Sequence, residues 1–292
     1  MATDERNFRS TYYEKVGCRS VEEKRSLEIL LKEKPLNRTK LKQFCLRFTV
    51  PSVHRALLWN LLLGLAPVFC DSHDYVMAQW SMVYEDLLRA LKVLRLIDDK
   101  TTKSRIFYAM WLLENRKLKA GVNINVENTF VDITEVLNGS SISENDVDLY
   151  WIAKGFYNIT REISHDFLKM KELTYVLLEK EDHAMFKHLT SLDIFHTLPM
   201  EKWYSSCFAG VLPKLSLIRI WDKICGKSKK IIVFVFIVLF NTQRVKLFRF
   251  KTVKEVLDHI DTIKENQEKG DLIVTKSIEL WQQNRSHRSQ ND

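Results

Sequence analysis

The chain has 292 residues, of which 46% are hydrophobic and 28% charged, and it carries a formal net charge of +8. These proportions are typical of a soluble globular protein and argue against a disordered chain or a multi-span membrane protein. There are only 8 Gly and 5 Pro, whereas average usage would give roughly 35 together in a chain this long. The composition therefore argues against turn-rich β architectures.

The positive charge is compatible with three kinds of partner, namely a nucleic acid, an anionic membrane surface or an acidic protein. Basic residues are locally dense between Lys227 and Lys230 and between Arg244 and Lys254. No recognised nucleic-acid motif surrounds them. We interpret them as solvated helix faces and predict no nucleic-acid partner.

The cysteine pattern and the length of the apolar runs indicate in which cellular compartment the protein is expected. The five cysteines form no C-x-x-C pair and no zinc-ligand spacing with histidine, which predicts reduced thiols and no metal site. The start of the chain is polar and lacks the apolar core of a secretory signal. The longest apolar run, Ile231–Phe240, is far shorter than the ~20 residues that span a bilayer. We expect a cytoplasmic protein without a transmembrane segment and a buried core helix at this run.

The first predicted helices are short. Ser20 and Glu23 form a capping box that should open the first helix, and Pro35 should stop it. Apolar residues at 41, 44, 45 and 48 place one face of a second helix in the core. Pro51 and Ser52 are expected to begin a third helix with a good N-cap, and Gly64 to end it in the left-handed conformation.

The longest helical pattern runs from Ser72 to Leu96, with apolar residues at helical spacing that predict one face packed throughout. Similar periodicity appears from Val126 to Leu137 and from Val147 to Trp151, with a loop at 138–141. No strand pattern competes, so the predicted fold class is all-α. Further helices are expected around 104–116, 151–170, 172–190, 199–210, 215–225, 229–243, 252–262 and 271–284.

Two groups of residues form ordered motifs. The first is an R-x-x-x-W pair followed by glycine, and the second combines W…F-x-x-x-L-P with L-R-x-W-D. Their members are Arg55, Trp59, Gly64, Trp203, Pro213, Trp221 and Asp222. Residues four apart share a helix face, so the guanidinium of Arg55 can pack on the indole of Trp59.

In order and spacing these motifs resemble the signatures of TBC domains, which are Rab GTPase-activating proteins. The resemblance implies a single TBC domain of two helical subdomains over residues 20–285, with an N-terminal segment at 1–19 and a polar tail at 286–292. It implies no cofactor.

The resemblance weakens where the family keeps its catalytic residues. An arginine stabilises charge on the transferred phosphoryl group and accelerates the reaction by about 10³ to 10⁵, while an amide orients the attacking water. TBC enzymes carry this arginine in I-x-x-D-x-x-R and the glutamine in Y-x-Q-G. Here Asp98 or Asp99 retains the acid, Lys100 follows, and the finger position falls on Thr101 or Thr102. No Y-x-Q occurs. We therefore expect a non-catalytic relative, a pseudo-GAP.

Further stretches resemble the short, nearly bare-domain TBC proteins that form the third subunit of the tuberous sclerosis complex. They lie at Arg6–Ser10, Tyr13–Gly17, Leu27–Lys32 and Cys207–Gly210. This resemblance implies binding to the C-terminal coiled coil of hamartin, with tuberin in the same complex acting on Rheb, and recruitment to lysosomal or other vesicle membranes through these partners.

Two alternatives remain open. The chain is an active Rab GTPase-activating protein if Arg95, Lys100 or Arg105 replaces the missing finger. It is a basic protein that binds nucleic acid or anionic lipid if the net charge itself is functional.

Overall fold

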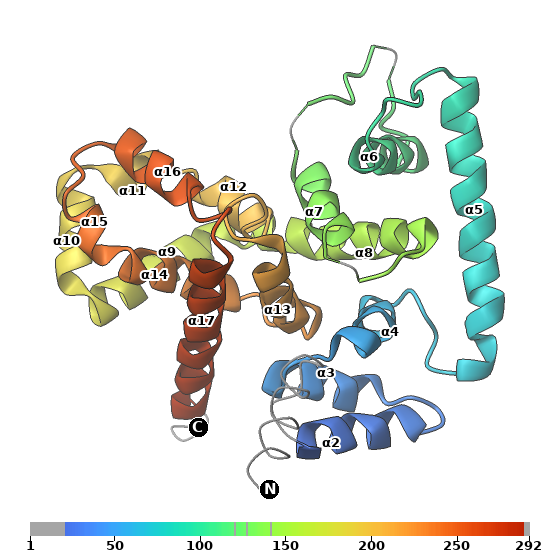
Figure 1. The fold of residues 1–292 in the computed structure, drawn as a ribbon, viewed down its shortest axis with the longest axis horizontal. Helices are drawn as coiled ribbons and strands as arrows, with labels where there is room; N and C mark the ends of the chain where they lie inside the picture. Colours follow the sequence, from blue (N-terminus) through green and yellow to red (C-terminus); the bar gives the residue numbers. More distant parts are fainter. Residues whose placement is uncertain (1–20, 120, 127, 141, 289–292) are drawn as a thin grey trace, which may run out of the picture. The chain divides into compact units, whose positions relative to one another are not determined.

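The structure is a computed structural model that describes residues 21–119, 121–126, 128–140 and 142–288; this part of the chain consists of helices and loops and contains no strand (Figure 1). The expected all-α class is confirmed. The helices are α2 Val21–Lys32, α3 Arg38–Arg47, α4 Ser52–Leu63, η1 Cys70–Ser72, α5 His73–Val93, α6 Lys103–Glu114, α7 Thr129–Asn138, α8 Asp146–His165, α9 Phe167–Glu181, α10 His183–Ser191, α11 Ile194–Thr197, α12 Met200–Ser205, α13 Lys214–Cys225, α14 Ile231–Thr242, α15 Arg244–Leu247, α16 Val253–Asp261 and α17 Gln267–Arg288.

The chain divides into two compact units, as the resemblance to TBC domains implies. Unit 1 comprises residues 1–158 with 225–227, and unit 2 comprises residues 159–224 with 228–292. Helix α8 runs across the boundary between them. No described helix is both long enough and apolar enough to cross a bilayer.

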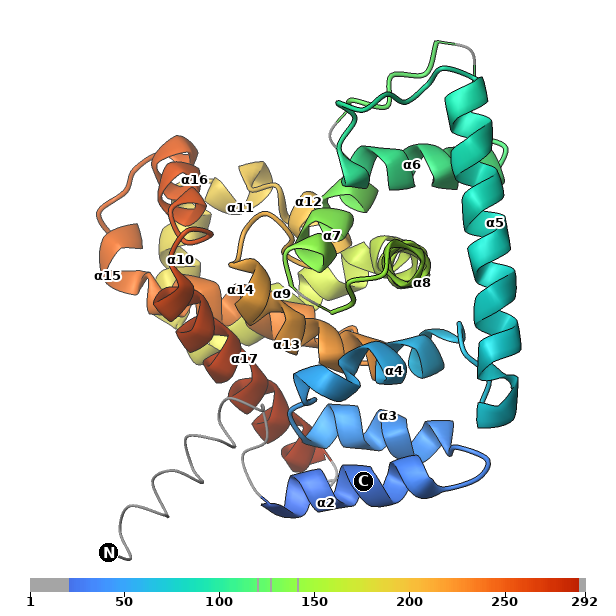
Figure 2. The same cartoon turned by 45° about the vertical axis from the view of Figure 1, so that its right-hand side comes forward.

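Unit 1 begins with α2, α3 and α4, which lie side by side (Figure 2). The side chain of Asn37 caps α3 by accepting the backbone N–H of Lys40 at 3.0 Å, which satisfies one of the free donors at a helix start. Gly64 ends α4 with φ +80°, as predicted. The predicted N-cap at the start of α4 is wrong: Pro51 holds that position without a side-chain hydrogen bond, and Ser52 is already helical. The predicted capping box includes Ser20, which lies outside the described residues.

Helix α5 differs from the prediction. Only Tyr84 and Leu91 are buried along its length, and the predicted stripe residue Leu94 lies beyond its end, 53% exposed. The periodic stripe is therefore not packed throughout. Helical spacing shows which residues share a face, but burial also needs a neighbouring element over that face.

Unit 2 is built around α14, whose residues from Ile231 to Phe240 are all buried. Helices α9 and α17 pack against it. A helix that is apolar on every side is stable only inside a core, so the predicted core helix is confirmed.

The predicted helix over 172–190 is wrong, because the chain breaks at Asp182 into α9 and α10. The Asp182 carboxylate accepts the backbone N–H of Met185 at 3.0 Å and starts α10. It also forms an ion pair of 2.7 Å with Arg244. Aspartate favours such capping positions over a helix interior.

Candidate functional site

The predicted finger position lies in the loop from Leu94 to Thr102, which joins α5 to α6 in unit 1. Asp98 organises this loop. Its carboxylate accepts the hydroxyl of Thr101 at 2.7 Å and the backbone N–H of Lys100 at 3.1 Å, and its own N–H donates to the Thr101 hydroxyl at 3.0 Å. The hydroxyl of Thr101, followed by the backbone amides, holds the pKa of Asp98 below its usual value. Asp98 is therefore an ionised carboxylate that stabilises a turn.

This loop lines a pocket of about 410 Å³. The loop and the start of α6 contribute three basic residues and one carboxylate to its lining. Two residues of a later loop complete the lining. The lining residues are Arg95, Leu96, Ile97, Asp98, Lys100, Thr101, Thr102, Arg105, Ile124 and Asn125. All four residues predicted for the degenerate finger region are present.

The three basic side chains of the pocket differ in whether they have a hydrogen-bond partner. Arg105 donates to the backbone carbonyl of Ile124 at 3.0 Å, so one of its N–H groups is already used. Arg95 occupies the left-handed region with φ +55°. Within the described part of the chain, the side chains of Arg95 and Lys100 have no hydrogen bond or ion pair, and both are exposed. The pocket can therefore attract an anion through Arg95 and Lys100, while one N–H of Arg105 is engaged by the backbone.

The two threonines at the predicted finger position offer only hydroxyl groups, and both hydroxyls lie close to polar groups of the same segment. The hydroxyl of Thr101 is bonded within the Asp98 turn. Thr102 is the N-cap residue of α6, although its side chain makes no cap hydrogen bond, and its hydroxyl lies 3.3 Å from that of Ser104. Sequence analysis missed Ile124 and Asn125, because nothing in their local pattern connects them with a loop some twenty residues earlier.

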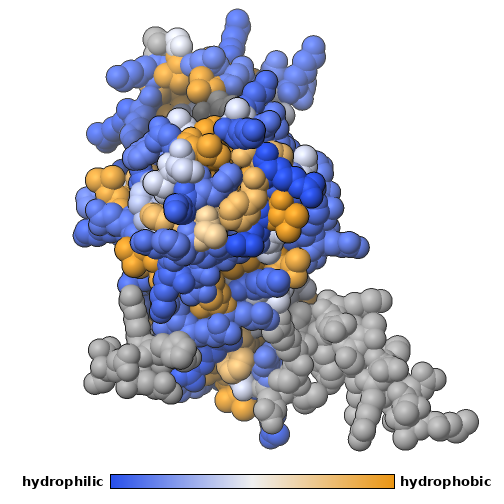
Figure 3. Space-filling model, turned by 90° about the vertical axis from the view of Figure 1, so that its left-hand side faces the viewer, coloured by the Kyte–Doolittle hydropathy of each residue, from blue (hydrophilic) through white to orange (hydrophobic). Residues whose placement is uncertain are grey.

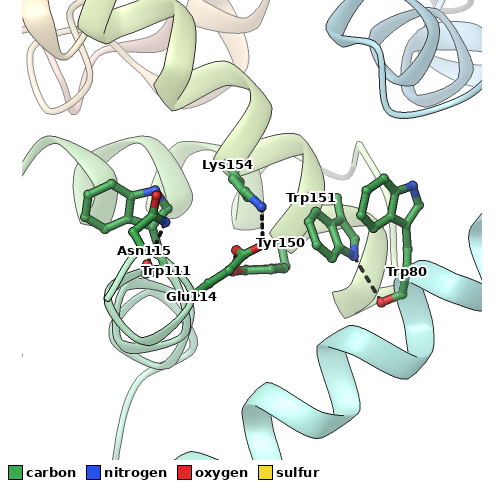
Figure 4. A network of polar contacts seen from close by, with 7 residues as sticks. All are labelled: Trp80, Trp111, Glu114, Asn115, Tyr150, Trp151 and Lys154. Atoms are coloured by element: carbon green, nitrogen blue, oxygen red, sulfur yellow. Dashed lines mark hydrogen bonds and ion pairs between the residues drawn. The ribbon is translucent and has the colours of Figure 1, made fainter. Parts of the chain in front are cut away.

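A polar network fixes the other end of α6 to α8 (Figure 4). The carboxylate of Glu114 accepts the hydroxyl of Tyr150 at 2.9 Å and pairs with the ammonium of Lys154 at 2.5 Å. Lys154 also lies 4.4 Å from the ring centre of Trp151, whose indole N–H donates to the Trp80 carbonyl at 3.2 Å. Burial, and next the charge of Glu114, raises the pKa of Tyr150. The phenol therefore stays protonated and donates its hydrogen bond, which makes this network structural.

The signature residues of unit 1 are architectural. Trp59 is fully buried and stacks on Phe156 with 5.8 Å between ring centres. The guanidinium of Arg55 donates to the backbone carbonyl of Val50 at 2.7 Å. This contact ties α4 to the segment that precedes it, so Arg55 stabilises the chain entry into the helix. The predicted packing of Arg55 on Trp59 stays a prediction.

The signature residues of unit 2 support an unusual backbone. Cys207 and Phe208 both have positive φ, 50° and 62°, a conformation that costs a non-glycine residue of the order of 1 kcal/mol or more. The indole N–H of Trp221 donates to the Cys207 carbonyl at 3.0 Å and holds this turn. Trp203, four residues before Cys207, and Asp222, the residue after Trp221, are also buried.

Pro213 sets the position of α17. A side chain at Gly270 would come within 2.5 Å of the Pro213 ring, so the helix can approach this closely only with glycine there. The signature proline therefore acts through packing.

Cys207 and the metal-ligating residue types are further candidates for a reactive site. Burial raises the pKa of the Cys207 thiol, which suppresses the nucleophilic thiolate. Among the residues that the structure describes, no three His, Cys, Asp or Glu side chains lie close enough together to hold a metal ion. The pocket at the finger loop is the candidate functional site of unit 1.

Comparison with known proteins assigns the family. A family model for the Rab-GTPase-TBC domain matches residues 136–248. The chain is 40% identical over 281 residues to TBC1 domain family member 7 of Bos taurus, covering 95% of this chain and 94% of that protein. It is 38% identical to TBC1 domain family member 7 of Homo sapiens over the same shares of the two chains.

Solved structures agree on the fold. The Ypt/Rab-GAP domain of Gyp1p superposes with a TM-score of 0.61 at 14% identity, over 90% of this chain and 98% of that domain. The Chlamydomonas flagellar RabGAP TBC domain superposes with a TM-score of 0.58 at 14% identity, over 85% and 87%. With relatives this similar along nearly its whole length, the chain belongs to the TBC domain family and is similar to the family's member 7.

Proposed function

We propose that this protein is a non-catalytic TBC subunit that binds the C-terminal coiled coil of hamartin and supports the action of tuberin on Rheb. The observation that supports this proposal is the finger loop, where the resemblance puts the arginine of TBC enzymes at Thr101 or Thr102. A threonine hydroxyl carries no positive charge, so it cannot supply the cation that an arginine finger places on the transferred phosphoryl group.

Two of the three neighbouring cations are poor substitutes. A lysine such as Lys100 lacks the planar fork of a guanidinium, and Arg105 already donates to the Ile124 carbonyl. No glutamine lines the pocket as described. Gln79 lies on the exposed side of α5, next to the sulfur of Met82. Losing the finger alone removes about 10³ to 10⁵ in rate, equivalent to roughly 4 to 7 kcal/mol of barrier.

Helix α5 supplies a surface of the kind that a coiled coil recognises. Tyr75, Met82 and Val93 are 70%, 59% and 77% exposed. They are seven and eleven residues apart, close to two and three helical turns, so they share one face. We name these three residues the α5 stripe. An amphipathic helix binds through such regularly spaced apolar anchors, and exposed apolar side chains on one face are typical of interaction sites.

The decisive experiment mixes the purified protein with the C-terminal coiled coil of hamartin and, separately, with a panel of GTP-loaded Rab proteins. We expect a stable complex in the first mixture and no acceleration of GTP hydrolysis in the second. Hydrolysis at the rate of a competent GTPase-activating protein, without hamartin binding, would contradict the proposal.

A second candidate function is an active Rab GTPase-activating protein with a displaced finger. The observation that favours it is Arg95, whose guanidinium lines the pocket and has no partner among the described residues. Replacing Arg95, Lys100 and Arg105 singly by alanine tests it. This candidate requires one replacement to abolish hydrolysis, whereas the non-catalytic subunit has no rate to lose.

The remaining assignments follow from this role. We infer that residues 20–285 form the TBC domain, preceded by a segment at 1–19 and followed by a polar tail at 286–292. We also infer a cytoplasmic protein that reaches lysosomal or other vesicle membranes through its partners. Fluorescence microscopy of the tagged protein with and without hamartin tests this localisation.

A further inference from the structure

A densely basic segment of unit 2 has no role in the proposed function. Residues 244–254, which we call the basic turn, contain five basic side chains and no acidic one. The segment comprises α15, the loop that follows it and the first two residues of α16. All five basic residues are exposed: Arg244, Lys246, Arg249, Lys251 and Lys254.

Apolar side chains project from the same segment. Val245 is 71% exposed and Phe248 is 38% exposed, whereas Leu247 between them is 1% exposed. Figure 3 looks onto the side on which α10, α15 and α16 lie in Figure 1, and there apolar patches are interspersed among hydrophilic side chains. The basic turn therefore presents cations and apolar groups to the same solvent.

The base of the turn is fixed to the rest of unit 2. The ring of His188 contacts the backbone carbonyl of Leu247 at 3.1 Å, and Arg244 pairs with Asp182 at 2.7 Å. The guanidinium of Arg244 also lies 4.9 Å from the ring centre of Phe248. With its base held in this way, the turn keeps Val245 and its basic neighbours outward.

Most of the charge on the turn is uncompensated. Lys246, Arg249, Lys251 and Lys254 have no ion pair within 4 Å among the described residues. The nearest acid in the sequence, Glu255, accepts the backbone N–H groups of Lys251 and Thr252 in the capping box of α16. Its carboxylate thus serves the helix start and also interacts electrostatically with Lys251, which leaves Lys246, Arg249 and Lys254 without a carboxylate within ion-pair distance among the described residues.

We propose that the basic turn binds directly to an anionic membrane surface, with its cations at the lipid headgroups and Val245 and Phe248 entering the interface. Clusters of four or more cations are attracted to anionic leaflets, at about fivefold in partitioning for each Lys or Arg. Exposed apolar side chains beside them gain by leaving water at the lipid boundary. A lone basic patch would fit nucleic acid equally well, but the two projecting apolar groups favour lipid. This contact is independent of hamartin and of the pocket at the finger loop.

Cosedimentation with phosphatidylcholine vesicles, with and without phosphatidylserine, tests the proposal on the intact protein. We expect binding only to the phosphatidylserine vesicles, declining as salt rises. Replacing Lys246, Arg249 and Lys251 together by alanine should weaken this binding about 100-fold, from roughly fivefold per cation. The matched control replaces Lys169, Lys214 and Lys276, three exposed lysines elsewhere in unit 2. It removes the same charge, and we expect a loss of less than about fivefold.

A second variant separates insertion from charge attraction. Val245→Ser with Phe248→Ser keeps every cation, and we expect it to weaken vesicle binding at least about tenfold. The proposal fails if the protein does not bind phosphatidylserine vesicles at low salt. It also fails if the control variant loses as much binding as the triple variant. Duplex DNA binding as tight as vesicle binding, together with no effect of the serine variant, would assign the turn to nucleic acid instead.

Discussion

Helices α5 and α14 both carry large apolar side chains, but they use them differently. In α14 ten consecutive residues, from Ile231 to Phe240, are buried within unit 2. In α5 only Tyr84 and Leu91 are buried, while the α5 stripe lies in solvent. Helix α14 is therefore a source of stability, and α5 offers apolar area that no described residue of unit 1 covers. The comparison predicts that substitutions in α14 change folding and substitutions in the α5 stripe change association.

The largest effect is expected in α14. Phe236 is fully buried and stacks on Phe240 with 4.4 Å between ring centres. Phe236→Ala should lower the free energy of unfolding by about 3–5 kcal/mol, because it removes buried area and leaves a cavity. Denaturant titration measures this change. The matched substitution Met82→Ala in the α5 stripe should stay within about 0.5 kcal/mol, and equal losses would refute the contrast between the two helices.

The next largest effect on stability is expected in the network between α6 and α8, which stabilises unit 1. Glu114→Ala leaves the hydroxyl of Tyr150 and the ammonium of Lys154 without their shared acceptor. We expect a loss of about 1–3 kcal/mol in the free energy of unfolding. Glu135→Ala, which removes an exposed acid on α7, is the control and should change stability by less than about 0.5 kcal/mol.

The α5 stripe should affect binding without affecting stability. Replacing Tyr75, Met82 and Val93 together by serine should weaken binding to the hamartin coiled coil by about tenfold or more. Isothermal titration measures the affinity, and thermal melting checks the fold. Leu168→Ser with Val176→Ser is the control, because both residues are exposed on α9 of unit 2, 71% and 63%. An unchanged affinity in the stripe variant would exclude α5 as the docking helix.

The smallest expected effect is a pH dependence in unit 2. Burial, and next the charges of Lys246 and Lys269, lowers the pKa of His259 from its usual 6.5. The unfolded chain therefore takes up this proton first as the pH falls. The stabilisation that comes from keeping His259 neutral is complete above about pH 6.5 and is lost as the pH falls toward the folded-state pKa.

The variant His259→Gln isolates this contribution. The imidazole contacts the side-chain oxygen of Gln243 at 2.9 Å, and glutamine can retain a hydrogen bond there without titrating. Stability measured from about pH 7 to about pH 5 should fall less steeply in the variant than in the unchanged protein. Identical slopes would show that other groups cause the acid sensitivity.

The sequence alone determined the features that depend on local chemistry. Gly64 ends α4 in the left-handed region because other residues adopt that conformation only at a cost. The run Ile231–Phe240 had to be buried, since no exposed helix is apolar on every side. That the chain contains no Y-x-Q segment is also a matter of residue identity, which needs no coordinates.

The tertiary structure decided what depends on neighbours. It buried only Tyr84 and Leu91 of the apolar face predicted for α5, because burial requires a covering element that the pattern does not specify. It broke the chain at Asp182, where a cap and an ion pair with Arg244, sixty-two residues away, outweigh helix continuation. It also closed the finger pocket with Ile124 and Asn125. Contacts between distant segments are set by packing in three dimensions, and a pattern along the chain does not contain them.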